Sequence, residues 1–338
     1  MPDRPRRNRA AALAAVLAAI TLLGLLAGFS QIKTEGLSWQ EAHYLPRLEA
    51  IAAGTAPAPA QYRLLTNRAV LLTVRVAEDL GAPRPAGLAF IAWRLALNFA
   101  VLGLAYAFYR SLGIAPWVAL LGLSALAWGM TQANYGSDLA LDASADLAFY
   151  LAAALAIRAR RYAWIPAITL LAAVNRETAG LIPVMLLASA VTLTPQFGLD
   201  RQMARYGATA LAVYGLAAAA MLADFGIRPW EGLETGASPY TGFLFHNLAS
   251  DAAWGHSVGV LGIVPLLALW VWRAWPDFLR PIVWSVVPAW CLLHLFLAPL
   301  DQARVLLLPQ ALVFLPALLY AIQEARAPLP QRHGEAAT

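Results

Sequence analysis

Long apolar stretches alternate with short polar segments along almost the whole chain. A helix that crosses a bilayer needs about 20 predominantly apolar residues, and most of the stretches approach that length. We therefore predict an all-α fold, a polytopic transmembrane helix bundle of about ten spans. The expected spans cover residues 10–30, 86–109, 113–131, 138–157, 162–174, 179–193, 206–224, 257–273, 281–299 and 303–322.

Two short stretches meet at a polar tetrad, residues 175–178, and form either one long helix or two short ones. Two helices make the number of spans even and place both termini in the cytoplasm. The inner segments then carry 14 of the 24 basic residues and 5 of the 19 acidic ones, as the positive-inside rule requires. A single helix would place the basic groups at 201–205 and 273–280 outside, so we predict two helices. The inner basic residues are Arg4, Arg6, Arg7, Arg9, Arg110, Arg158, Arg160, Arg161, Arg201, Arg205, Arg273, Arg280, Arg326 and Arg332, and the inner acidic ones are Asp3, Asp200, Asp277, Glu324 and Glu335.

Composition excludes several classes of protein. The 338 residues are 60% hydrophobic and 13% charged, whereas a soluble domain carries about 25% charged residues. A water-soluble domain is therefore excluded, and residues 1–322 are expected to form a single transmembrane domain with a cytoplasmic tail at 323–338. The net charge of +5 indicates topology and not nucleic-acid binding. The single cysteine, Cys291, excludes an intramolecular disulfide.

Two extracytoplasmic loops are expected at residues 31–85 and 225–256. In the first, the segment from Leu64 to Leu80 has the pattern of an amphipathic helix. Such a helix lies flat on the outer leaflet or packs on the ends of the spans, and we favour the flat arrangement. Its apolar face holds Leu65, Ala69, Leu72, Val76 and Leu80, and its polar face holds Arg68, Arg75 and Asp79.

Charged residues within the apolar stretches are the candidate functional groups, because a charge in hydrocarbon costs roughly 2.5–3.5 kcal/mol. Asp138, Asp142 and Asp146 recur every four residues and so share one helix face. Asp138 suits a helix cap. Asp142 and Asp146 lie deeper and are expected to be protonated, paired with arginine or bound to a cation, although a purely structural pairing remains an alternative.

Arg94 and Asp146 are each expected roughly 12 Å below the outer surface, so we predict an Arg94–Asp146 ion pair. The tetrad Asn175-Arg176-Glu177-Thr178 falls at a similar depth, where non-helical backbone is tolerated only in a cavity lined by protein or water. The alternatives are a structural clamp for Arg94 and an internal brace between Arg176 and Glu177.

Further polar groups lie at the outer ends of the spans. They include the segments Gln40-Glu41-Ala42-His43-Tyr44 and Asp301-Gln302-Ala303-Arg304. The histidines His43, His246, His256 and His294 are expected there too, and solvated side chains are favoured over a metal site. Together these residues indicate a polar cavity open to the outside. Its carboxylates could act as a general base and its arginines could hold a phosphate.

This layout resembles the GT-C superfamily of membrane glycosyltransferases, which use polyprenyl-phosphate sugars. The family often carries Asp-Glu-x-x-Tyr soon after its first helix, and Gln40-Glu41-Ala42-His43-Tyr44 matches its Glu and Tyr, with glutamine in place of aspartate. The resemblance implies that Glu41 is the base that deprotonates the acceptor hydroxyl. It is an analogy of layout, and fold alone does not establish function.

The chain also resembles a branch of small bacterial membrane proteins of similar length. The shared segments are Tyr62-Arg63-Leu64-Leu65, Asp146 before the Arg-rich 158–161, Asn-Arg-Glu-Thr at 175–178, and Asp301 with Arg304. The chain departs from the branch at Ala148 and Asn67, where a proline is common. This resemblance implies location in a bacterial inner membrane.

The predicted function is therefore transfer of a sugar from a polyprenyl-phosphate donor to an acceptor on the extracytoplasmic face. The expected catalytic residues are Glu41, Asp142 and Asp146, and the residues expected to bind lipid phosphate and sugar are Tyr62, Arg63, Arg94, Asn175, Arg176, Glu177 and Arg304. A divalent cation is a candidate cofactor. The expected partners are the polyprenyl-phosphate lipid and membrane lipids, without nucleic acid.

Two alternatives remain. The first is a transporter or lipid flippase that uses the intramembrane Asp and Arg groups as a relay. Transporters often have repeated halves with broken helices, whereas the sequence indicates one broken element, at the tetrad. The second is a non-catalytic membrane scaffold, which fits the buried acids poorly.

Overall fold

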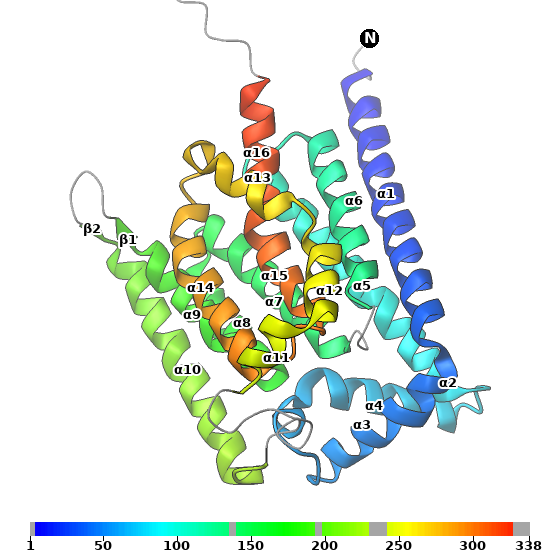
Figure 1. Ribbon diagram of the computed structural model, residues 1–338. Helices are drawn as coiled ribbons and strands as arrows, with labels where there is room; N and C mark the ends of the chain where they lie inside the picture. The colour runs from blue at the N-terminus through cyan, green and yellow to red at the C-terminus, as the bar shows by residue number, and fades with distance from the viewer. Residues whose placement is uncertain (1–3, 135–139, 193–197, 230–241, 327–338) are drawn as a thin grey trace, which may run out of the picture.

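The computed structural model describes residues 4–134, 140–192, 198–229 and 242–326, and these form a bundle of helices (Figure 1). The helical bundle expected from the sequence is therefore confirmed. Within the described ranges five helices are long and apolar enough to cross a membrane, or six if one bent pair counts as a span. The remaining apolar helices are shorter, so ten full-length spans are not established. The five are Ala10–Thr34, Pro85–Ser111, Arg201–Phe225, Leu279–Leu297 and Ala303–Ala325.

The first part of the chain contains one long helix followed by short ones that lie across one end of the bundle (Figure 1). Gly36 adopts a φ of 75°, which ends the first helix and lets the chain turn. We call the end that carries α3 and α4 the loop end. The elements are α1 (Arg4–Glu35), α2 (Leu37–Trp39), a π-helical turn (Gln40–Tyr44), α3 (Leu45–Ala52), a 3₁₀ turn (Ala60–Tyr62) and α4 (Leu64–Asp79).

The predicted amphipathic helix is confirmed as α4, but the predicted apolar face is not the one that is buried. The buried residues are Thr66, Asn67, Val70, Leu71 and Val74. Leu72, Val76 and Leu80 are exposed. The helix packs on the ends of α5, α7 and α8 through a neighbouring face, so its apolar stripe points away from the bundle.

Three helices form the centre of the N-terminal half: α5 (Pro85–Ser111), α6 (Pro116–Gln132) and α7 (Leu141–Arg158). Proline at the first turn suits the start of α5 and α6, because its missing N–H would have no partner there. Helix α1 packs closely on α5 through glycines: a Cβ on Gly24 would lie 2.5 Å from the ring of Phe99. Small residues allow this approach, as in many membrane helix pairs.

The apolar stretch around the tetrad forms two helices, as predicted. They are α8 (Ile165–Asn175) and α9 (Leu181–Ser189). Between them Arg176 is extended, and Glu177–Gly180 forms a 3₁₀ turn. Tyr162, just before α8, and Ser189, at the end of α9, line the same cavity, so the chain reverses direction at the tetrad.

A two-stranded antiparallel hairpin, β1 (Val191–Thr192) with β2 (Gly198–Leu199), leads into α10 (Arg201–Phe225). In its register Val191 lies opposite Leu199. Helix α10 then packs along both α8 and α9. It therefore covers the helical pair that carries the tetrad.

The C-terminal part differs from the prediction. The predicted outer loop 225–256 contains helices. The predicted span 257–273 is wrong, because its first helix begins earlier, at Asp251, and the span is interrupted after Leu261. Helices α12 and α13 are bent by 62° at a break where Gly262 has a φ of 54°. The elements are α11 (Leu244–Ala249), α12 (Asp251–Leu261), α13 (Val264–Trp270), α14 (Leu279–Leu297), α15 (Leu307–Pro309), a π-helical turn (Gln310–Phe314) and α16 (Leu315–Ala325).

The main core lies between α5, α6 and α7 and the C-terminal helices. Its largest fully buried side chains include Tyr109 and Tyr150. The Tyr109 hydroxyl donates to the carbonyl of Ala311 at 3.0 Å, which ties α5 to the last helical segment. Helix α1 begins and α16 ends at the same end of the bundle, opposite α3 and α4 (Figure 1).

Candidate functional site

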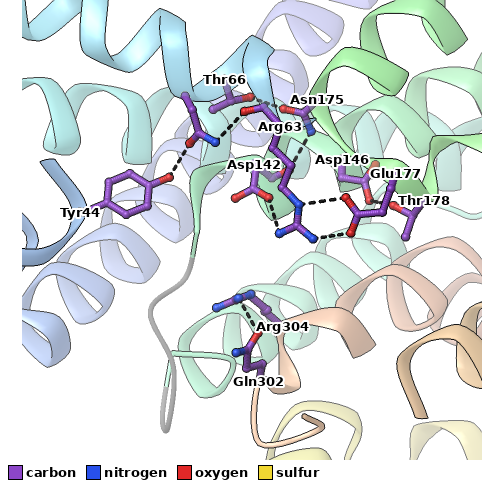
Figure 2. A network of polar contacts seen from close by, with 11 residues as sticks. Tyr44, Arg63, Thr66, Asp142, Asp146, Asn175, Glu177, Thr178, Gln302 and Arg304 are labelled. Carbon is purple, nitrogen blue, oxygen red and sulfur yellow. Dashed lines mark hydrogen bonds and ion pairs between the residues drawn. The ribbon is translucent and has the colours of Figure 1, made fainter. Parts of the chain in front are cut away.

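Arg63 is the centre of a charged network at the loop end (Figure 2). It lies between the 3₁₀ turn 60–62 and α4, where the backbone change directs its side chain toward the bundle. Its Nε donates to Glu177 Oε2 at 2.9 Å, its Nη2 pairs with Glu177 Oε1, and its Nη1 donates to Asp142 Oδ2 at 3.2 Å. Burial by itself lowers the pKa of Arg63, but Glu177 and Asp142 raise it above its ordinary value. The guanidinium therefore stays charged.

The broken helix at the tetrad positions the partners of Arg63. Asn175 ends α8 and donates to the carbonyl of Asp142 at 2.9 Å, while its own oxygen accepts from Thr66. Thr178 donates to Asp146 Oδ2 at 2.8 Å. Side chains from three of the four tetrad positions, Asn175, Glu177 and Thr178, therefore connect the tetrad to α7 and to the start of α4.

Two tyrosines satisfy the backbone that the break releases. Tyr150 donates to the carbonyl of Thr178 at 2.6 Å, and Tyr214 donates to the carbonyl of Glu177 at 2.7 Å. Buried backbone carbonyls need such partners. The irregular segment is consequently held by hydrogen bonds from α7 and α10.

The predicted ion pair between Arg94 and Asp146 is wrong. Asp146 accepts from Thr178 through one oxygen, and its other oxygen has no hydrogen-bond partner among the described residues. Arg94 is buried on α5. Helix α7 is rotated so that Asp146 faces the tetrad, although α5 packs directly against α7. Asp138 lies outside the described residues.

A cavity of about 530 Å³ opens beside this network. Four arginines line it: Arg47, Arg63, Arg176 and Arg304. All four interact electrostatically with Asp142. The volume of the cavity is in the range of small-molecule sites, about 300–1,000 Å³. Phe243, Leu293 and Leu297 supply an apolar wall.

Arg176 is the least satisfied of the four arginines. Arg176 is 5% exposed, and within the described part of the chain its side chain forms no hydrogen bond or ion pair. A buried charge without a hydrogen-bonding partner is costly. The guanidinium lies on the cavity wall and can accept an anion there.

His294 is a cavity residue that sequence reasoning missed. It is 5% exposed, not solvated as expected, and its ring packs on Trp290 with 4.4 Å between centroids. Its Nδ1 lies 2.8 Å from the carbonyl of Trp290. A donating Nδ1 leaves Nε2 as an acceptor, and Nε2 has no partner among the residues the structure describes. The sequence feature that could have identified His294 as a cavity residue is its position near the outer end of an apolar stretch.

Glu41 lies outside this cavity. It pairs with Arg84 through oxygens at 2.9 and 3.3 Å, and this hydrogen bond and charge raise the pKa of Arg84. Tyr44, from the same turn, donates to Asn67 at 2.9 Å, and Asn67 donates to the carbonyl of Arg63 at 2.7 Å. The segment therefore supports Arg63 through Tyr44, while Glu41 points elsewhere.

The other predicted residues divide clearly. Arg63, Arg176, Glu177 and Arg304 line the cavity, whereas Asp142, Asp146 and Asn175 lie behind it in the hydrogen-bond network. Tyr62 does not line it, because its hydroxyl donates to the carbonyl of Gly226 at 2.7 Å.

Asp301, in the same late segment as Arg304, is bonded elsewhere. His246 Nε2 lies 3.1 Å from Asp301 Oδ2, and Ser250 donates to Asp301 Oδ1 at 3.0 Å. Arg304 itself donates to Gln302 Oε1 at 2.6 Å (Figure 2). Within this segment Arg304 therefore lines the cavity, whereas Asp301 contacts α11 and the start of α12.

No group of three or more His, Cys, Asp or Glu side chains among the described residues is placed to hold a metal ion. In the charged network Arg63 lies between Asp142 and Glu177 and pairs with both carboxylates. Comparisons of the chain with protein-family models, curated proteins and solved structures gave no match.

Proposed function

We propose that this protein is a membrane glycosyltransferase of GT-C type that binds a polyprenyl-phosphate sugar in the cavity at the loop end. The observation that carries this proposal is Arg176, a buried guanidinium without a hydrogen-bond partner in the described chain, on the wall of a cavity with three further arginines. Planar guanidinium groups match the oxygens of a phosphate. Glu177 and Asp142 already pair with Arg63, whereas Arg176 is attracted by Asp146 and Asp142 without a hydrogen bond to either, so its N–H groups remain available to a phosphate.

The cavity also suits a lipid tail. Leu293 and Leu297 line it and are 37% and 49% exposed. They lie on α14, a helix of membrane-spanning length. A polyprenyl chain can therefore lie along this apolar edge while its phosphate reaches Arg176.

The proposed reaction is an inverting transfer. The acceptor oxygen attacks the anomeric carbon, the bond from that carbon to the phosphate oxygen breaks, and polyprenyl phosphate leaves with the bonding electrons. The arginines stabilise the charge on the leaving phosphate. We assign the acceptor proton to Nε2 of His294, a cavity residue whose Nδ1 is bonded to the carbonyl of Trp290, whereas Glu177 is held by Arg63.

We further propose the ten-span topology with both termini in the cytoplasm of a bacterial inner membrane. Its support is the arrangement of ends: α1 begins and α16 ends on the same side (Figure 1), and the chain reverses at the tetrad. Arg158, Arg160 and Arg280, all on predicted inner segments, line one cavity. This grouping follows the positive-inside rule.

Binding of undecaprenyl phosphate tests the proposal. Purified full-length protein in mild detergent is titrated with this lipid and, separately, with undecaprenol, which lacks the phosphate, and bound lipid is counted by native mass spectrometry. We expect preference for the phosphate and a loss of about tenfold or more in Arg176→Ala, since a charge-assisted hydrogen bond contributes about 1.5–3 kcal/mol. Arg68→Ala, an exposed arginine on α4, is the matched control. Equal binding of both lipids, or full retention by Arg176→Ala, would contradict the proposal.

A second candidate function is transport. The sequence indicated one broken element, but the structure contains a second, the pair α12 and α13 bent by 62°. Paired broken helices are a feature of transporters. Uptake or flipping of a fluorescent polyprenyl phosphate in proteoliposomes, abolished by Asp146→Asn, would favour this reading.

A further inference from the structure

A second cavity, of about 750 Å³, lies at the other end of the molecule, away from α3 and α4. The end of α7, the end of α9, the start of α10 and the start of α14 form its walls. None of the residues assigned above to sugar transfer lines it. Its polar and aromatic lining includes Arg158, Arg160, Tyr162, Asp277, Arg280 and Trp284.

The charge of this lining is predominantly positive. Three arginines face one acid, Asp277, whose side chain is 93% exposed and lies 3.3 Å from Arg280 Nη1. Arg280 Nη2 donates to the carbonyl of Arg273 at 3.1 Å. Its Nε is buried and has no hydrogen-bond partner in the described chain. The Arg280 side chain is thus fixed at the cavity wall with one donor unsatisfied.

The other two arginines lie at the end of α7 and in the turn that follows it. The guanidinium of Arg158 lies 6.0 Å from the centre of the Phe278 ring, a cation–π contact that positions it. Arg160 adopts a φ of 56°, which breaks the helix and places its side chain at the cavity. Arg158 at the end of α7 and Arg160 after it therefore line the cavity together with Arg280 of α14.

The cavity lies at the level where lipid headgroups are expected. Arg280 lies in the first turn of α14, a helix of membrane-spanning length, and Trp284 follows one turn later. Trp284 is 75% exposed. Tryptophan is enriched at the membrane–water interface, and basic pockets between helices on the cytoplasmic side bind acidic headgroups.

We propose that this cavity binds the phosphodiester headgroup of an anionic phospholipid, with Arg158, Arg160 and Arg280 around the phosphate and Trp284 beside the acyl chains. A soluble phosphate would need the same guanidinium groups, but an exposed tryptophan at the cavity, on a helix of membrane-spanning length, favours a lipid. The site is independent of sugar transfer, because it uses other residues at the other end of the bundle.

Native mass spectrometry of full-length protein tests this site with three probes: phosphatidylglycerol, the zwitterionic phosphatidylcholine, and inorganic phosphate. We expect retention of phosphatidylglycerol over phosphatidylcholine and a loss of about tenfold or more in Arg158→Gln/Arg280→Gln. Arg205→Gln is the matched control, because Arg205 is an exposed arginine at the start of α10 that does not line the cavity. A thermal scan of each variant establishes that it is folded.

Three results would overturn the proposal. They are equal retention of the two lipids, unchanged retention in the double variant, and displacement of phosphatidylglycerol by millimolar phosphate, which would assign the cavity to a soluble anion. If the double variant does not fold, Arg160→Gln, on an exposed turn, takes its place with the same expected direction. Undecaprenyl phosphate binding is measured on the same variants and should not change, so the two proposals fail separately.

Discussion

Removal of the Arg63 guanidinium should destabilise the protein far more than removal of an exposed arginine. Arg63→Met keeps much of the side-chain volume but leaves Asp142 and Glu177 without their cation. The side chains of Arg63 and Asp142 are 10% and 5% exposed, whereas that of Glu177 is 36% exposed. Breaking a buried ion pair costs about 3–5 kcal/mol, and because water reaches Glu177 we expect the lower part of this range, about 3 kcal/mol.

Arg84→Met is the control within the same chain. Arg84 and Glu41 also form a bidentate pair, but their side chains are 57% and 29% exposed. Such a solvent-exposed pair contributes little to stability, and its small effect should decrease further at high salt. The two substitutions are chemically identical, so the difference between them measures burial.

The free energy of unfolding is measured on full-length protein in detergent micelles by denaturant titration, followed by tryptophan fluorescence. A third variant, Arg63→Met/Asp142→Asn/Glu177→Gln, replaces all three charges with neutral groups. It should recover most of the stability, because a buried ion pair can be replaced by neutral groups at little cost. The reasoning is refuted if Arg63→Met is no more harmful than Arg84→Met. It is also refuted if the triple variant is as unstable as Arg63→Met, since the loss would then come from packing.

Two further predictions concern packing and chemistry. Gly24→Val should destabilise the protein by about 1–3 kcal/mol, because a Cβ at this position meets the ring of Phe99. The control Gly103→Ala should be tolerated, because nothing lies within 4 Å of a Cβ there. Equal unfolding midpoints for the two variants would contradict close packing of α1 on α5. His294→Asn should lower the rate of sugar transfer by about 100-fold or more with unchanged binding of undecaprenyl phosphate, whereas Glu41→Gln should leave the rate nearly unchanged; the opposite pattern would return the role of base to Glu41.

The positions of most helices follow from local sequence. Apolar runs and the polar tetrad at 175–178 each report on the residues next to them, so the existence of the helices and the reversal at the tetrad were predicted. The start of α6 at Pro116 was not, because the predicted span began at residue 113. The break at Gly262 was missed, because a single glycine in an apolar stretch is compatible with a continuous helix. The limits of α4 were also predicted, since amphipathic periodicity is a local property.

The partners of the charged residues depended on tertiary structure. Depth along a helix can be counted from sequence, so Arg94, Asp146 and the tetrad were placed in one layer. The rotation of each helix about its axis cannot be counted in this way, because it is set by packing against several neighbours at once. That rotation turns Asp146 toward Thr178 and exposes the apolar stripe of α4.

The sequence alone determined that this chain forms a helical bundle of membrane composition with costly charges near one end. Only the tertiary structure decided that Arg63 joins Asp142 and Glu177, that Arg176 faces a cavity, and that His294 lies beside it while Glu41 does not. The physical reason is that hydrophobicity and helix propensity act over neighbouring residues. A hydrogen-bonded charge network instead joins α4, α7 and the tetrad, whose positions along the chain are separated by up to 114 residues.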